Sequence, residues 1–267
     1  MVKGLYTAYT GMVQEQRRLD VLANNLANST TVGYKKEGAT SKSFRDELAL
    51  RIKDTERRGV RGIGNIKMGV KVGETYTDYS DGATQVTDEN ADLAIAGDGF
   101  FAIEFTDKNQ NTSVKYTRNG EFNVDNNGYL VTVDGDHVLD QQAAMAGTTG
   151  EDGYIRVDPM RDFFVDQDGT IYQDNVPTGQ TIGLVDVDNR DYLYKYGENL
   201  YDLEDGGQII DGTGTIEQGY LEMSNVNIAY EMVNMIAIQR AYETGQKMIQ
   251  TEDSTIEMAV SQVGQVS

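Results

Sequence analysis

Apolar residues recur at every seventh position near both ends of the chain. Near the C-terminus the repeat runs without a break through Ile228, Met235, Tyr242, Ile249, Ile256 and Val263. Near the N-terminus it consists of Leu5, Met12, Leu19 and Leu26, with Leu22 on the same stripe. A seven-residue repeat keeps one stripe of a helix turned towards a partner helix, as in a coiled coil. The pattern therefore predicts two long helices that pair with each other or with neighbouring copies of the chain.

The ends of both helices follow from local signals. Residues 3–27 read as one helix that should stop between Asn28 and Gly33, where β-branched residues precede a glycine. The C-terminal helix should begin after Ser224-Asn225-Val226-Asn227, which offers several N-cap candidates. No proline interrupts residues 228–263, so a single helix of about 53 Å is expected. A long helix that folds back onto a monomer is the alternative to an assembly seam.

The middle of the chain consists of short apolar or alternating runs, such as Leu93–Ala96 and Phe100–Phe105, separated by turn signals. Asx-Gly pairs favour the positive φ angles of tight hairpin turns. These pairs are Asp81-Gly82, Asn119-Gly120, Asn127-Gly128, Asp134-Gly135, Asp168-Gly169, Asp205-Gly206 and Asp211-Gly212. The pattern predicts an antiparallel β domain.

The predicted fold class is α+β, with the terminal helices paired as a coiled-coil-like stem and a β-rich middle. We divide the chain into 1–34 and 223–267 as the two halves of the stem, 76–222 as the β domain and 35–75 as a basic connector. Glycines beyond Arg57 give the connector poor helix propensity, so we expect it to be partly helical and partly extended.

Charge is unevenly distributed along the chain. The net charge is −20, which opposes binding to nucleic acid or anionic lipid. Residues 35–71 nevertheless hold eleven Lys or Arg against five Asp or Glu, whereas residues from 72 onward hold nine against thirty-six. The basic segment is either a solvated connector or a strap that lies on the acidic body of an adjacent subunit. The strap hypothesis centres on Arg57, Arg58 and Arg61.

Several protein classes lack support in the residues. The longest apolar runs are four residues, too short to span a bilayer, and no charged segment followed by an apolar stretch suggests a cleavable secretory signal. Cysteine is absent, which excludes disulfides and thiol chemistry. His137, the single histidine, has no nucleophile-elbow motif to accompany it. Acidic pairs at 166–168 and 186–188 lack the distal Glu of a calcium loop. We therefore expect no enzyme activity, no cofactor and no metal.

Three separate blocks of sequence resemble the bacterial flagellar rod and hook protein family. The first is residues 23–35, the second residues 91–101 with 116–122, and the third residues 219–227 followed by 231–236 and 240–243. Thr30 stands where the family usually has Asn, and Thr255-Ile256 replaces its common Met-Leu. The length is most like that of the distal rod proteins. The residues that carry the terminal signatures are Asn24, Asn25, Leu26, Asn28, Gly33, Tyr34, Ser224, Asn225 and Val226.

The resemblance implies a structural subunit of the flagellar basal-body rod, polymerised into a hollow helical tube that transmits torque from motor to hook. It also implies export by the flagellar type III apparatus, a location outside the cytoplasmic membrane, and contacts with other copies, other rod proteins and the hook protein. Paired helices that make open-ended contacts would generate such a helical array. The alternative is a secreted or surface β-domain protein, adhesin-like, with a helical oligomerisation stem.

Overall fold

The computed structural model describes the chain apart from residues 1, 45–46, 52–60, 67–68, 198 and 265–267. It divides into two compact units. We call one the terminal unit, which contains residues 1–27, 36–78 and 227–267, and the other the β unit, which contains residues 28–35 and 79–226. No helix in the described part of the chain is long and apolar enough to cross a membrane.

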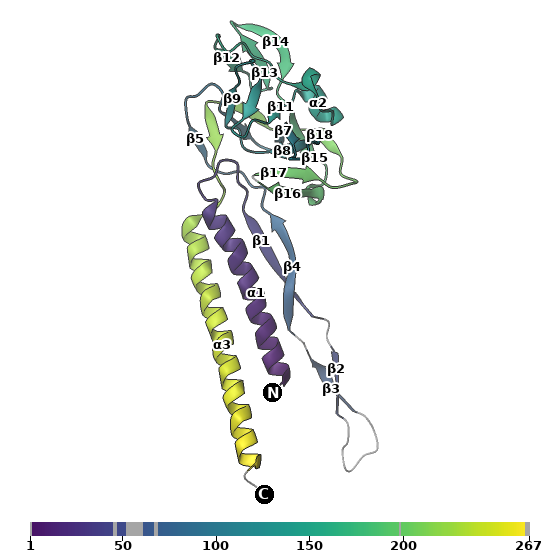
Figure 1. Ribbon diagram of the computed structural model, residues 1–267, viewed down its shortest axis with the longest axis vertical. Coiled ribbons are helices and arrows are strands. Elements are labelled where there is room, and N and C mark those ends of the chain that lie inside the picture. The colour runs from purple at the N-terminus through teal and green to yellow at the C-terminus, as the bar shows by residue number, and fades with distance from the viewer. Residues whose placement is uncertain (1, 45–46, 52–60, 67–68, 198, 265–267) are drawn as a thin grey trace. The chain divides into compact units, whose positions relative to one another are not determined.

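The terminal unit contains two long helices, α1 (Val2–Ala27) and α3 (Ile228–Gly264), which confirm the prediction of a helix at each end of the chain. They run side by side in opposite directions (Figure 1). Asn227 is the N-cap of α3, because its Oδ1 accepts a hydrogen bond from the Tyr230 amide at 3.1 Å. Gly245 weakens α3 as a helix former, but a Cβ there would lie 2.6 Å from Cγ of Met12. This glycine therefore permits the close approach of the two helices.

Strands form the described part of the basic connector. β1 (Glu37–Ser43) pairs with β4 (Val70–Thr77), and β2 (Glu47–Arg51) pairs with β3 (Arg61–Ile66), both antiparallel. The prediction that the connector is partly helical is therefore wrong for the described residues. Side chains of α1 contact this hairpin, because Gln14 Nε2 donates to Ser41 Oγ at 2.8 Å. Tertiary pairing of β-branched and small polar residues thus overrides any local helical preference.

The β unit is built from antiparallel sheets, as predicted. Its largest sheet has nine strands, in the order β16-β17-β8-β7-β11-β10-β9, with β15 paired to β7 and β18 paired to β15. Smaller sheets are β12-β13-β14, β19-β6 and β20-β5. The strands are β5 (Thr84–Val86), β6 (Leu93–Ala96), β7 (Phe100–Thr106), β8 (Thr112–Thr117), β9 (Phe122–Val124), β10 (Leu130–Thr132), β11 (His137–Val138), β12 (Phe163–Val165), β13 (Thr170–Gln173), β14 (Val176–Thr181), β15 (Leu184–Val187), β16 (Leu193–Gly197), β17 (Leu200–Leu203), β18 (Ile209–Asp211), β19 (Thr215–Gln218) and β20 (Tyr220–Glu222).

The core of the β unit lies against both faces of β7, whose residues Phe100 to Ile103 are buried. A short helix, α2 (Gln141–Ala146), and the 3-10 turns η1 (Glu151–Gly153) and η2 (Arg190–Tyr192) complete the unit. We did not predict these helical segments.

The Asx-Gly pairs have two different structural causes. Gly128 and Gly169 have φ of +84° and +80° and turn the β9–β10 and β12–β13 hairpins, as predicted. Gly82, Gly120 and Gly212 do not have positive φ, and the hairpin prediction is wrong for these three. A Cβ on Gly82 would overlap the carbonyl oxygen of Met223, and one on Gly120 would overlap that of Leu93. Close approach of two backbones, rather than a turn, requires glycine at both positions.

Candidate functional site

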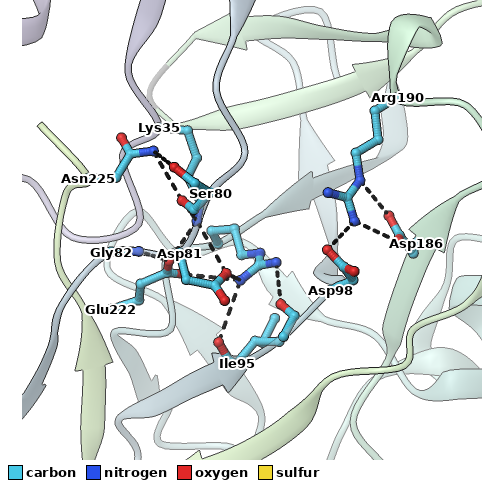
Figure 2. A network of polar contacts seen from close by, with 12 residues as sticks. Lys35, Ser80, Asp81, Gly82, Ile95, Asp98, Asp186, Arg190, Glu222 and Asn225 are labelled. Carbon is cyan, nitrogen blue, oxygen red and sulfur yellow. Dashed lines mark hydrogen bonds and ion pairs between the residues drawn. The ribbon is translucent and has the colours of Figure 1, made fainter.

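Residues of the N-terminal and C-terminal signature blocks meet in the β unit around the buried carboxylate of Glu222 (Figure 2). Lys35 Nζ donates to Glu222 Oε1 at 2.6 Å, and Arg118 Nη1 donates to Glu222 Oε2 at 3.1 Å. The three side chains are at most 2% exposed. Asp81, which is half exposed, lies 3.9 Å from Lys35 and 3.5 Å from Arg118. Two buried cations are therefore balanced by one buried and one partly solvated carboxylate.

Backbone groups complete the hydrogen bonding of this cluster. The Gly82 amide donates to Glu222 Oε1 at 2.8 Å, and Lys35 Nζ also donates to the carbonyl oxygen of Ser80 at 2.8 Å. Arg118 Nη2 donates to the carbonyl oxygen of Gly97 at 2.7 Å. Burial lowers the pKa of Lys35, and the Glu222 carboxylate opposes that shift. Satisfied partners are what make buried charges tolerable, so each member depends on the others.

Lys35, Arg118 and Glu222 lie in the three sequence blocks, but the sequence did not indicate that they form a cluster. We predicted Lys35 as part of the basic connector, whereas the structure buries Lys35 in the β unit. Lys35 therefore contributes nothing to an exposed basic strap. The signal that could have revealed the cluster is that Lys35, Arg118 and Glu222 come one from each of the three blocks.

Gly33 and Tyr34 hold the N-terminal signature against the β unit. The Gly33 amide donates to the Glu222 carbonyl oxygen at 2.7 Å, and its φ is +68°. A Cβ at Gly33 would overlap the backbone of Asn119. The Tyr34 ring lies under Lys195 Nζ at 4.0 Å from the ring centroid, which is a cation–π geometry. Contacts within the β unit therefore explain why the chain has Gly and Tyr at these two signature positions.

The C-terminal signature makes equally local contacts. Asn225 Nδ2 donates to the carbonyl oxygen of Ser80 at 3.0 Å and to its Oγ at 3.2 Å. Ser224 Oγ accepts from the Val226 amide at 3.3 Å, and Ser224 and Val226 are buried. Ser80 thus receives hydrogen bonds from both signatures, through Lys35 and through Asn225 (Figure 2).

The remaining N-terminal signature residues serve the end of α1 and the turn after it. In the terminal unit the buried Asn25 amide group pairs with the backbone of Glu37, donating at 2.8 Å and accepting at 2.9 Å. It thereby extends the β1 ladder onto the helix. Asn28 belongs to the β unit, and its Oδ1 accepts from Thr31 Oγ1 at 3.3 Å. Asn24 is exposed and Leu26 is half-buried.

The predicted heptad residues lie on α1 and α3, and most are half-buried. This group comprises Leu5, Met12, Leu19, Leu22, Leu26, Met235, Tyr242, Ile249 and Ile256. Ile228 is exposed, and the side chain of Val263 lies outside the described part of the chain. Packing of α1 against α3 within the terminal unit accounts for part of this burial. Their contact with other copies stays a prediction.

The helices of the terminal unit also expose large apolar side chains that the heptad analysis did not identify. On α1 and α3 these are Tyr6, Tyr9, Val13, Tyr230, Met232, Val233, Ile236, Met248, Met258 and Val260. Val233, which lies within the first two turns of α3, is 65% exposed. Concentrations of exposed apolar residues are typical of protein interaction surfaces.

The residues proposed for the basic strap are not described in full. Arg57 and Arg58 lie outside the described residues, and so does the side chain of Arg61, the first residue of β3. The strap therefore stays a prediction.

Other candidate chemistry is occupied by structural contacts. His137 stacks on Tyr154 with ring centroids 4.1 Å apart. Asp186, from one of the acidic pairs, accepts from Arg190 at 2.8 Å, and Asp98 accepts from the same guanidinium at 2.6 Å (Figure 2). The hydrogen bond to Asp186 contributes most to raising the pKa of Arg190, and the bond to Asp98 raises it further. Among the described residues, no group of three acidic, His or Cys side chains could hold a metal ion.

Three family models match the chain in the regions of the three signature blocks. A model described as flagella basal body rod protein matches residues 5–35, and one described as flagellar hook protein FlgE/F/G D1 domain matches residues 94–173. A third, described as flagellar basal body rod FlgEFG protein C-terminal, matches residues 217–262.

Similar proteins cover almost the entire chain. The flagellar basal-body rod protein FlgG of Bacillus subtilis is 37% identical over 98% of this chain and 99% of its own length. FlgG of Borreliella burgdorferi is 34% identical over 97% and 98%, and FlgF of Caulobacter vibrioides is 32% identical over the full length of both. These matches confirm the resemblance and favour it over the adhesin-like alternative. They also place the chain among structural proteins rather than enzymes. The chain belongs to the family of flagellar basal-body rod proteins.

Proposed function

We propose that this chain is a subunit of the distal rod and polymerises with other copies of itself into a hollow helical tube that transmits torque from motor to hook. The observation that carries this proposal is the exposed apolar surface of α3. Met232, Val233 and Ile236 are each about half exposed or more on a helix that already packs against α1. A contact that covers this surface without closing on itself generates a helical array.

The assignment to the distal rod rests on the relatives. Proteins named FlgG align with this chain over nearly the full length of both. The position outside the cytoplasmic membrane, export without a cleavable signal by the flagellar export apparatus, and contacts with other rod proteins and the hook protein follow from that assignment. We propose the division into a stem, 1–34 with 223–267, a basic connector and a β domain on the same basis.

Within the stem we propose that the heptad residues supply a coiled-coil-like seam and that the exposed apolar residues supply contacts between copies. Gly245, which lets α3 approach Met12, supports close helix packing within the subunit. The side chains on the outer face of α3 would then be buried against a neighbouring subunit, where each large apolar side chain contributes about 1.5–3 kcal/mol.

A double substitution on the exposed face tests the proposal. In cells that lack the native gene, Met232→Gln with Ile236→Gln should abolish rod assembly and motility. The purified variant should unfold at the same temperature as the parent, because both side chains are exposed in the subunit. The matched control is Met160→Gln on the β unit, since Met160 is 92% exposed and should tolerate the change. Normal rods and swimming in the double variant would contradict the proposal.

A further inference from the structure

Glu231 is a buried carboxylate that lacks the partners given to Glu222. It lies in the first turn of α3 and is 4% exposed. Its Oε2 atom is buried and accepts no hydrogen bond from the described residues. A buried carboxylate without a hydrogen-bonding partner destabilises the structure that contains it. Glu222, buried to a similar degree, accepts bonds from Lys35 and Arg118.

Glu231 lines a groove of about 280 Å³ in the terminal unit. Arg18 and Leu22 of α1, the β1 strand, Tyr76 of β4 and Ile238 of α3 form the other walls. Leu22 and Ile238 provide apolar surface next to the carboxylate.

The two cations that line this groove already have carboxylate partners. Arg18 pairs with Glu15 at 3.1 Å, and Lys36 pairs with Asp78 at 3.5 Å. Burial raises the pKa of Glu231, and the charge of Lys36, whose ion pair is with Asp78, opposes this shift. Glu37 also lines the groove, but Glu231 has the buried carboxylate, and this carboxylate forms no ion pair with a described residue of the subunit.

We propose that this groove receives a lysine or arginine side chain of a second copy of the chain, which pairs with Glu231 in the assembled rod. The alkyl part of such a side chain suits the apolar walls, and its charged end suits the carboxylate. A divalent metal would need more carboxylates than the groove offers.

Two observations favour a second copy as the source of the cation. The groove adjoins the exposed apolar surface of α3, because Tyr230 lines the groove and is itself 61% exposed, and Val233, one turn further along the helix, lies beside it. Apart from the buried Lys35, residues 36–71 hold ten Lys or Arg against five Asp or Glu, so a copy has cations to supply. This inference rests on the proposed function, because it requires that copies polymerise.

Glu231→Gln gives opposite results in the isolated subunit and in the assembly. The purified subunit should unfold at a higher temperature than the parent, because an unpaired buried charge is removed. The critical concentration for polymerisation should rise at least roughly tenfold, because the incoming cation loses its partner. A side chain that merely supports the fold would change both quantities in the same direction. The matched control is Glu243→Gln, which alters an exposed carboxylate of the same helix and should change neither.

Ile249→Asp serves as a reference that separates the two hypotheses. If Ile249→Asp and the apolar double variant both polymerise normally, the proposed function fails. If they fail to polymerise while Glu231→Gln polymerises like Glu243→Gln, the cation pairing is wrong and water alone occupies the groove. Loss of thermal stability in Glu231→Gln would also overturn the inference, because the carboxylate would then be paired within the subunit. Normal homopolymers in vitro with defective rods in cells would assign the cation to a different rod protein and overturn the second-copy occupant.

Discussion

Glu222→Gln isolates the contribution of the buried charge cluster to the stability of the β unit. The substitution keeps the size of the side chain, but removes the negative charge between Lys35 and Arg118 and replaces one of the two accepting oxygens with an NH2 donor. Both cations are 1% exposed, and among the described residues the other carboxylate that forms an ion pair with them, that of Asp81, is 3.5 Å or more away and 55% exposed. Breaking a buried pair by removing one partner costs about 3–5 kcal/mol, because the remaining charge stays buried and unpaired.

Thermal unfolding followed by circular dichroism measures this effect. For a domain of this size each kcal/mol lowers the midpoint temperature by about 2–4 °C, so we expect a decrease of roughly 10 °C. Asp98→Asn is the matched control, because it makes the same chemical change to an ion pair of 2.6 Å. Asp98 is 61% exposed, however, and an exposed pair contributes about 1 kcal/mol or less.

Equal losses in Glu222→Gln and Asp98→Asn would show that burial does not determine the strength of these pairs. A double variant, Glu222→Gln with Lys35→Gln, adds a second test. It should recover part of the loss of the single variant, because only one unpaired cation remains buried. A loss equal to the sum of the two single losses would show that Lys35 and Glu222 are not coupled.

Four shorter predictions concern other parts of the chain. Ile249→Asp, like Leu19→Asp, should prevent rod assembly by placing a charge in an apolar seam, while the unfolding transition of the β unit stays unchanged. Gly33→Ala should lower the stability of the β unit by at least about 1 kcal/mol, measured by urea unfolding, because its φ of +68° and the backbone of Asn119 exclude a Cβ. Burial raises the pKa of Glu231 above its ordinary value of 4.5, so between the two values the folded state holds a proton that the unfolded chain has lost. The free energy of unfolding of the isolated subunit should therefore fall as the pH rises through that window, and Glu231→Gln should lack this fall. Reversing the charge of the proposed strap, by changing Arg57, Arg58 and Arg61 to Glu, should weaken assembly and flatten its dependence on salt concentration. An unchanged salt dependence would show that the segment is only a solvated connector.

The long helices could be predicted from the sequence because their pattern is local and repeated many times. A stripe such as Met235, Tyr242 and Ile249 is visible without knowledge of any distant contact. The short helix α2 was missed because six residues are too few for a period to emerge. Its signals were an alanine-rich run and Gly147, which adopts the left-handed conformation with φ of +62° at the C-cap.

Long-range contacts determine what sequence reasoning missed. Lys35 and Glu222 are 187 residues apart, and each resembles an ordinary solvated charge in its own segment. Gly82 resembles a hairpin glycine but is required by the carbonyl oxygen of Met223, which the pairing of β20 with β5 brings next to it. Local patterns report on backbone conformation and amphipathicity, whereas burial of a charge depends on which distant residue neutralises it.

The contacts of the signature residues constrain where assembly can occur. Gly33, Lys35, Glu222 and Asn225 are engaged with one another or with Ser80 inside the β unit, so they hold a single subunit together. The heptad residues are partly covered by the packing of α1 on α3. Groups whose contacts are incomplete in the subunit are therefore better candidates for contacts between copies. In the described part of the terminal unit these groups include exposed apolar residues of α3 and the carboxylate of Glu231, which both lie in the first turns of the same helix.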